Sequence, residues 1–105
     1  AEHLDFKGQE GSVQWYQEND GEAANFTLKL RYASKDKKSL RPMDLYVNNK
    51  NIGQVKFNHT GGWDIWREVE IKAPLLAGAN DIELRTVGKS GPNISSLTVE
   101  YATGP

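Results

Sequence analysis

The sequence contains no cysteine, which excludes disulfide bonds, thiolate catalysis and cysteine-based zinc sites. It has only two histidines, His3 and His59, and they are too far apart for the ligand spacing of a zinc site. It also lacks any run of about 18 apolar residues, so no segment is predicted to span a membrane. These absences exclude several kinds of catalytic and metal site, but they do not assign a cellular compartment.

The chain has little net charge, −1 at neutral pH with a pI near 6.1. Nucleic-acid affinity depends mostly on clustered Lys and Arg that neutralise phosphates, so we expect no nucleic acid as partner and no membrane. No signal peptide is recognisable, and the start at Ala1 resembles a processed or excised fragment. Localisation therefore has to be inferred from function.

The dominant pattern is an alternation of apolar and polar residues, which is the period of a half-buried strand. In residues 25–33 the apolar side chains that share one face are Phe26, Leu28, Leu30 and Tyr32. Similar stretches separated by turn residues predict about seven strands, at 12–16, 25–33, 43–47, 52–57, 68–72, 81–87 and 97–101. No apolar stripe has helical spacing. We predict one all-β domain over residues 1–105, built as an antiparallel sandwich.

A glycine pair precedes a tryptophan in Gly61-Gly62-Trp63, within a polar loop. A ring held there has little to pack against, and its face suits the C–H-lined face of a sugar. Trp66 lies three residues later, so at strand spacing we expect one ring in the core and one outside. Strand parity puts Trp63 on the core side, the glycine pair favours the outside, and a structural role for both rings stays open.

Asn93 follows Gly91-Pro92 at a junction between loop and strand, where an amide can donate to and accept from a sugar hydroxyl. The alternative is that Asn93 caps its own turn. The 14 acidic residues lie mostly on outward strand positions or in charged turns, and none indicates the carboxylate pair that glycosidic hydrolysis needs. Nothing in the sequence points to catalysis.

Several segments, taken in order, resemble the carbohydrate-binding modules of families 6 and 35, which share a galactose-binding-like β-sandwich of the jelly-roll type. The most specific of them are Thr60-Gly-Gly-Trp-Asp-Ile-Trp66 and, further along, Gly91-Pro-Asn-Ile94. The resemblance covers nearly the whole chain. It implies that Trp63 stacks on the sugar and that Asn93 hydrogen-bonds to it, in a cleft formed by loops at one end of the sandwich.

The resemblance adds two candidates. His3 stands where such modules carry a second aromatic residue, so the usual sandwich of sugar between two rings is in doubt, although His3 can still donate a hydrogen bond. The guanidinium of Arg41 can hydrogen-bond to a uronate carboxylate or to vicinal hydroxyls, or else it can pair with Asp36 or Asp44. The resemblance also implies a further first strand, and this chain begins after that point. A Glu-Ala-Glu-like motif there helps bind structural calcium in the family, so calcium stays a candidate cofactor.

These observations predict a non-catalytic module that binds a polysaccharide or oligosaccharide and targets a tethered, secreted catalytic domain to it. The expected localisation is therefore extracellular, and the parent protein is expected to be a glycoside hydrolase or polysaccharide lyase. One alternative is a structural or protein-interaction sandwich with Trp63 buried. Another is a small glycosidase or lyase. The sequence does not identify the glycan.

Overall fold

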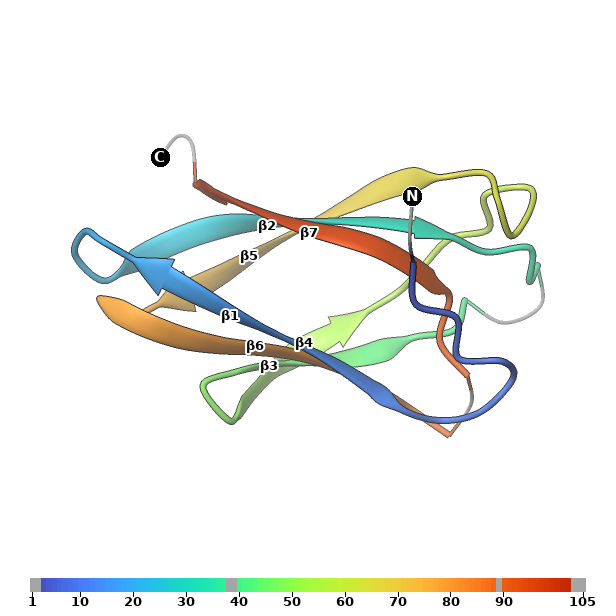
Figure 1. The fold of residues 1–105 in the computed structure, drawn as a ribbon, viewed down its shortest axis with the longest axis horizontal. Helices are drawn as coiled ribbons and strands as arrows, with labels where there is room; N and C mark the ends of the chain where they lie inside the picture. Colours follow the sequence, from blue (N-terminus) through green and yellow to red (C-terminus); the bar gives the residue numbers. More distant parts are fainter. Residues whose placement is uncertain (1–2, 38–39, 89, 103–105) are drawn as a thin grey trace.

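The computed structural model describes residues 3–37, 40–88 and 90–102. They form two antiparallel sheets packed face to face, with strand orders β1-β6-β3-β4 and β5-β2-β7 (Figure 1). The strands are β1 (Ser12–Asn19), β2 (Ala24–Ala33), β3 (Met43–Val47), β4 (Lys50–Val55), β5 (Arg67–Leu75), β6 (Gly78–Thr86) and β7 (Asn93–Tyr101). These ranges contain no helix, and hence no helix that could cross a membrane. The prediction of an all-β antiparallel sandwich is confirmed.

The core lies between the sheets and is built from alternate strand residues. β2, the central strand of its sheet, buries every apolar residue that the alternation assigned to one face, and these pack against residues of β3 and β6. Each such side chain contributes roughly 1.5–3 kcal/mol when removed from water. The buried residues of the three strands are Phe26, Leu28, Leu30, Tyr32, Met43, Leu45, Val47, Ile82 and Leu84.

Two strands begin three or four residues earlier than the alternation predicted. β6 begins at Gly78, although residues 77–80 read as a plain connection. β7 begins at Asn93 instead of 97, because Ile94 pairs with Tyr32 of β2 and forms a bridge with Leu4. Both additions depend on partners distant in sequence, which an alternation pattern does not contain.

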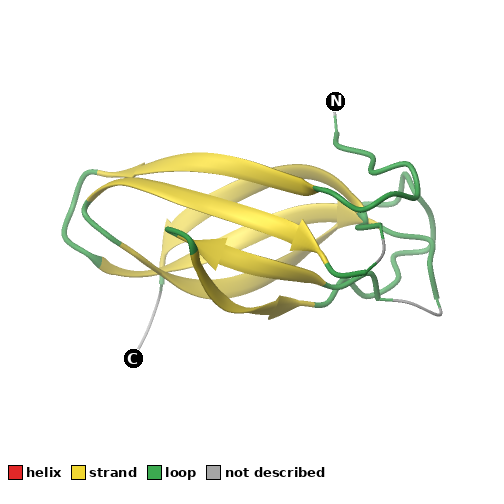
Figure 2. Cartoon of the chain, turned by 90° about the horizontal axis from the view of Figure 1, so that it is seen from below, coloured by secondary structure: helices red, strands yellow, loops and turns green. Residues whose placement is uncertain are grey.

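The two ends of the sandwich differ in character. Short turns such as 20–23 and 48–49 close one end, whereas the longer loops and the segment after His3 gather at the other (Figure 2). At the turn end, Asn48 and Asn49 have φ angles of 50° and 70°, the left-handed conformation that the asparagine-rich turn predicted. The loop end therefore has the residues available to build a site.

Asn80 organises the turn end from a buried position. Its Oδ1 accepts hydrogen bonds from the Leu76 amide and from Asn48 Nδ2, each at 2.8 Å. Its Nδ2 donates to the carbonyls of Leu76 at 2.9 Å and Gly78 at 3.0 Å. The side chain thus satisfies backbone groups that the strands leave unpaired at this turn.

We expect Asn80→Ala to lower the free energy of unfolding by about 2–3 kcal/mol, because several buried polar groups lose their partner at once. Urea denaturation checks this value. The exposed Asn25→Ala is the matched control and is expected to change stability by no more than about 0.5 kcal/mol. Equal losses in the two variants would contradict the role given to Asn80.

Candidate functional site

A shallow cavity of about 280 Å³ opens at the loop end of the sandwich. It draws on four separate parts of the chain, and its lining residues are Asp5, Gly8, Arg41, Trp63 and Asn93. Three of the four residues predicted from the sequence meet here, namely Trp63, Asn93 and Arg41. Trp63 is 37% exposed, so part of the residue is accessible at the cavity.

The loop that carries Trp63 is held by hydrogen bonds to the end of β2. The amide of buried Thr60 donates to the Ser34 carbonyl at 2.8 Å, and the Ser34 amide donates to Thr60 Oγ1 at 3.0 Å. Thr60 Oγ1 also lies 3.0 Å from the carbonyl oxygen of Gly62. These bonds tie Thr60 and Gly62 of the loop to the end of β2, and none of them involves the indole ring.

Glycines are required where the loop turns toward Trp63. Gly61 has a φ of +107°, which side chains rarely adopt. A Cβ on Gly62 would lie 3.2 Å from Asp64 Oδ1 and 3.3 Å from the Ile65 side chain. The glycine pair thus permits a tight turn that places the tryptophan at the cavity.

Tyr32 fixes the start of the same loop. Its hydroxyl donates to the carbonyl of Asn58 at 2.8 Å. Burial raises the pKa of Tyr32 above its ordinary value, which favours the protonated form that donates this bond. A core residue of β2 is thereby tied to the loop that carries Trp63.

Asn93 is buried, and its side-chain amide is hydrogen-bonded to the loop that carries Trp63. Its Nδ2 donates to the main-chain carbonyl of Trp63 at 3.0 Å. The bond links the first residue of β7 to the tryptophan loop and fixes the position of the indole relative to the cavity wall. The side chain therefore has a positioning role in addition to lining the cavity, and neither role is the capping of its own turn.

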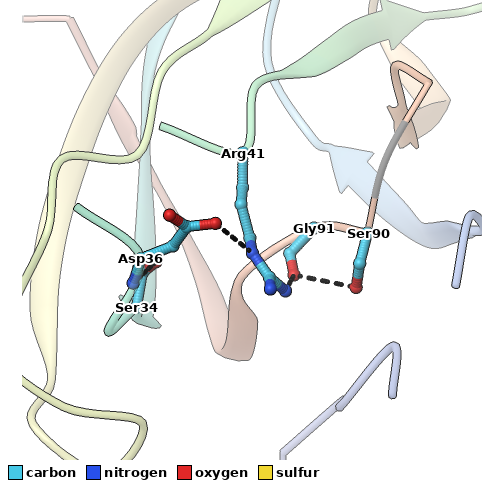
Figure 3. A network of polar contacts seen from close by, with 5 residues as sticks. All are labelled: Ser34, Asp36, Arg41, Ser90 and Gly91. Carbon is cyan, nitrogen blue, oxygen red and sulfur yellow. Dashed lines mark hydrogen bonds and ion pairs between the residues drawn. The ribbon is translucent and has the colours of Figure 1, made fainter. Parts of the chain in front are cut away.

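Arg41 contacts Trp63 directly. The guanidinium carbon lies 4.6 Å from the centroid of the indole, a cation–π arrangement. Nη1 donates to the Gly91 carbonyl at 3.0 Å, and Nε donates to Asp36 Oδ2 at 3.3 Å (Figure 3). Arg41 therefore joins three loops, and of the two acidic partners suggested by the sequence it uses Asp36.

The conformation of Arg41 is strained, since its φ of 41° lies in the left-handed region that non-glycine residues seldom occupy. The Gly91 carbonyl, which accepts a hydrogen bond from Arg41, lies in a crowded place. A Cβ on Gly91 would lie 2.8 Å from the Phe6 side chain and 2.9 Å from Met43 Sδ. The Ser90 hydroxyl also donates to the Gly91 carbonyl, at 3.3 Å (Figure 3). The bonds that Arg41 makes to Asp36 and Gly91, with the indole stack, offset the backbone strain.

His3 and Trp66 lie together outside this cavity. Their rings are 5.2 Å apart in an edge-to-face contact, and Arg31 covers the Trp66 ring at 4.7 Å. Trp66 is half-buried and does not belong to the core, so the expectation of one core ring among Trp63 and Trp66 is wrong. The reason is strand parity: Glu68 pairs with outward-facing Arg31, and Trp66 precedes it by two residues.

Asp5 lines the cavity but was not among the residues predicted from the sequence. It lies in a turn in which the Lys7 amide donates to its Oδ1 at 2.7 Å, and Lys7 and Gly8 have φ angles of 54° and 77°. The short run Asp-Phe-Lys-Gly is a usable turn signal. Its position beside Trp63 depends on the bridge between Leu4 and Ile94, which the sequence alone does not reveal.

Calcium is the cofactor that the resemblance to known modules implies. Calcium prefers several carboxylate and carbonyl oxygens around one point. Within residues 3–37, 40–88 and 90–102, no three His, Asp or Glu side chains gather closely enough to hold a metal ion. Calcium stays a prediction, and no step proposed below involves the ion.

Comparison with protein families matches residues 6–101 to the model of carbohydrate binding module family 6. A protein of Formosa agariphila named "Putative beta-glucuronidase" is 45% identical over 98 residues, which are 92% of this chain and 10% of that protein. A cycloisomaltooligosaccharide glucanotransferase of Niallia circulans is 38% identical over 72% of this chain and 8% of its own length. The chain thus spans about a tenth or less of these curated relatives.

Solved structures give the same relationship. A family 35 carbohydrate binding module from Clostridium thermocellum superimposes with a TM-score of 0.87 and 28% identity, covering 95% of this chain and 78% of that one. A second module, Xyl-CBM35 in complex with a disaccharide that contains glucuronic acid, has a TM-score of 0.78 and 28% identity. That match covers 90% of this chain and 69% of the other.

We expect Thr60→Val to lower the free energy of unfolding by about 1–3 kcal/mol, because the substitution keeps the shape but leaves the Ser34 amide without its acceptor. Chemical denaturation measures the loss. Thr27→Val, on the outer face of β2, is the control and is expected to be close to neutral. A Thr60→Val protein as stable as wild type would show that these bonds do not hold the loop.

Proposed function

The chain belongs to carbohydrate-binding module family 6, and on this premise we propose that it holds a polysaccharide in the cavity of Trp63, Arg41, Asn93 and Asp5. The observation that carries the proposal is the partly exposed indole at the cavity wall, held by a loop whose hydrogen bonds are made elsewhere. A sugar ring stacked on the free surface of that indole would bury C–H groups against it. The proposed function is adsorption without catalysis.

Polar groups around the indole support recognition of hydroxyls. Arg41 supplies N–H donors, while the Asp5 carboxylate and the Asn93 amide oxygen supply acceptors. A guanidinium also matches the geometry of a carboxylate. We therefore place a uronate-bearing saccharide among the candidate ligands, in line with the glucuronic acid disaccharide held by one of the similar modules.

The proposed biological role is targeting. A single stacked ring and a few hydroxyl contacts give modest affinity, because the gain must exceed the cost of ordering the sugar and displacing water. Tethering to a catalytic domain turns this weak contact into a high effective concentration of enzyme at its polymer. Since such polymers lie outside the cell, we propose that the protein is secreted and that its partner domain is a polysaccharide-degrading enzyme.

We expect Trp63→Ala to abolish or reduce by at least about tenfold the affinity for the polysaccharide that binds wild type, a change of about 1.4 kcal/mol or more. Affinity electrophoresis against xylan, glucuronoxylan, β-glucan, galactan and uronate polymers identifies that polysaccharide. Titration calorimetry with an oligosaccharide of the same polymer measures the loss.

Trp66→Ala is the matched control, since it removes a tryptophan of the same segment that lies outside the cavity. It is expected to keep binding within about twofold, provided that both variants unfold cooperatively. Equal loss of binding in the two variants contradicts the assignment of the site. A wild-type protein retarded by none of the polymers contradicts the proposed function and favours a structural spacer.

We expect Arg41→Lys to weaken binding almost as much as Arg41→Ala, by about three- to tenfold. Lysine keeps the charge, but it lacks the planar guanidinium. It therefore cannot stack on Trp63 while it donates hydrogen bonds to Asp36 and Gly91. Calorimetry on the three proteins provides the comparison. Wild-type affinity in Arg41→Lys would mean that only the charge of Arg41 matters.

A further inference from the structure

Of the described residues that line the cavity at the loop end, two carry a charge, and the protein compensates these two charges differently. Arg41 is paired with Asp36, whose Oδ2 lies 3.3 Å from Nε. Asp5 takes part in none of the ion pairs found in the part of the chain that the structure describes. Its Oδ1 accepts one hydrogen bond, from the Lys7 amide at 2.7 Å. A ligand in the cavity therefore meets the Asp5 carboxylate without a counter-charge from the described residues.

The guanidinium of Arg41 is already used on both edges that could hold a carboxylate. One edge consists of Nε and Nη2, and its Nε donates to Asp36 Oδ2. The other consists of Nη1 and Nη2, and its Nη1 donates to the Gly91 carbonyl at 3.0 Å. A carboxylate is bound most strongly when both nitrogen atoms of one edge donate to it in parallel. Such a contact with a uronate would have to share a nitrogen atom with Asp36 or with Gly91.

The side chain of Asn93 presents an acceptor to the cavity. Its Nδ2 is committed to the Trp63 carbonyl, so Oδ1 is the atom of the amide that is left for a ligand. Among the described residues no buried side-chain oxygen lacks a hydrogen bond, and none of them donates to this Oδ1, so the atom is accessible. A sugar hydroxyl can donate to it, whereas an ionised carboxylate has no proton to donate.

Asp5 is held in place by the residues on either side of it. The preceding residue, Leu4, forms a bridge with Ile94 at the start of β7. The following residue, Phe6, packs against the core, and a Cβ on Gly91 would lie 2.8 Å from its ring. A carboxylate fixed on both sides in this way acts on a ligand from a defined position in the cavity wall.

We infer that Asp5 sets the charge selectivity of the cavity, which takes a neutral sugar residue and disfavours a uronate. The inference rests on the proposed function, which leaves neutral and uronate-bearing saccharides as candidates. Hydroxyls of a neutral sugar donate to Asp5 and to Asn93, whereas a sugar carboxylate donates to neither and is repelled by Asp5. This preference distinguishes the chain from the similar module in complex with a disaccharide that contains glucuronic acid.

Pairs of saccharides that share a backbone and differ in acidity test the inference. The pairs are oligosaccharides of β-glucan and of galactan, each before and after oxidation of the primary hydroxyls to carboxylates, and xylan with densely substituted glucuronoxylan. Titration calorimetry at low salt is expected to show at least about fivefold tighter binding of the neutral member by wild type. Asp5→Asn removes the charge but keeps an oxygen for the Lys7 amide. It is expected to bring the two affinities within about twofold.

Glu10→Gln is the matched control, since it removes one negative charge from an exposed residue of the same segment that does not line the cavity. It is expected to keep the wild-type ratio of the two affinities. Raising the salt from 0.1 M to 1 M shortens the screening length from roughly 10 Å to 3 Å. The wild-type ratio is therefore expected to fall toward one, a response that a purely structural role of Asp5 does not give.

Tighter binding of the acidic member by wild type overturns the inference, and so does a ratio that Asp5→Asn leaves unchanged. In both cases, binding that is lost in Trp63→Ala still supports the proposed function. Wild type that binds neither member of any pair contradicts the proposed function itself, and the inference with it.

Discussion

The candidate site depends on one constraint, which is that the loop carrying Trp63 must keep its shape while the indole stays at the surface. Burying the indole would stabilise the loop, but it would remove the ring from the cavity wall. Hydrogen bonds from Thr60 to Ser34, from Asn93 to the Trp63 carbonyl and from Tyr32 to Asn58 supply the order instead. Each of these partners is fixed in turn by β2 or β7, so the precision of the loop comes from the sheet beneath it.

The position of Arg41 follows from the same constraint. Water around an exposed indole does little to hold the ring in place. A guanidinium against the ring restrains it without removing it from the cavity. The strained backbone at Arg41 is the cost of placing that group, and it is tolerable because Gly91 and Asp36 provide fixed acceptors. Under the proposed function, a ring arranged before the ligand arrives loses less entropy on binding, which matters most where only one ring is available for stacking.

The sequence predicted most of the fold because a sandwich of short strands is encoded locally. Alternation identified the core face of β2, and the asparagines of residues 48–51 identified a turn. The beginnings of β6 and β7 were not predictable, since they depend on Gly78 pairing with Asn19 of β1 and on Ile94 meeting Leu4. In the site, the glycine pair indicated Trp63 from residue chemistry, whereas the resemblance to known modules gave His3. The structure places His3 against Trp66, outside the cavity, because the chain at Leu4 is bound to β7.

Trp63 and Trp66 show why exposure, more than residue type, decides what a tryptophan can do. Both lie in one short segment and both have an arginine over the ring. Trp66 is flanked as well by His3 and follows the outward parity of β5, so its ring completes the outer face of a sheet. Trp63 comes directly after two glycines, at the wall of a cavity that also holds a carboxylate and an amide. The difference lies in what surrounds each ring, which is set by residues more than 20 positions away in either direction, at 31 and 41 on one side and at 93 on the other.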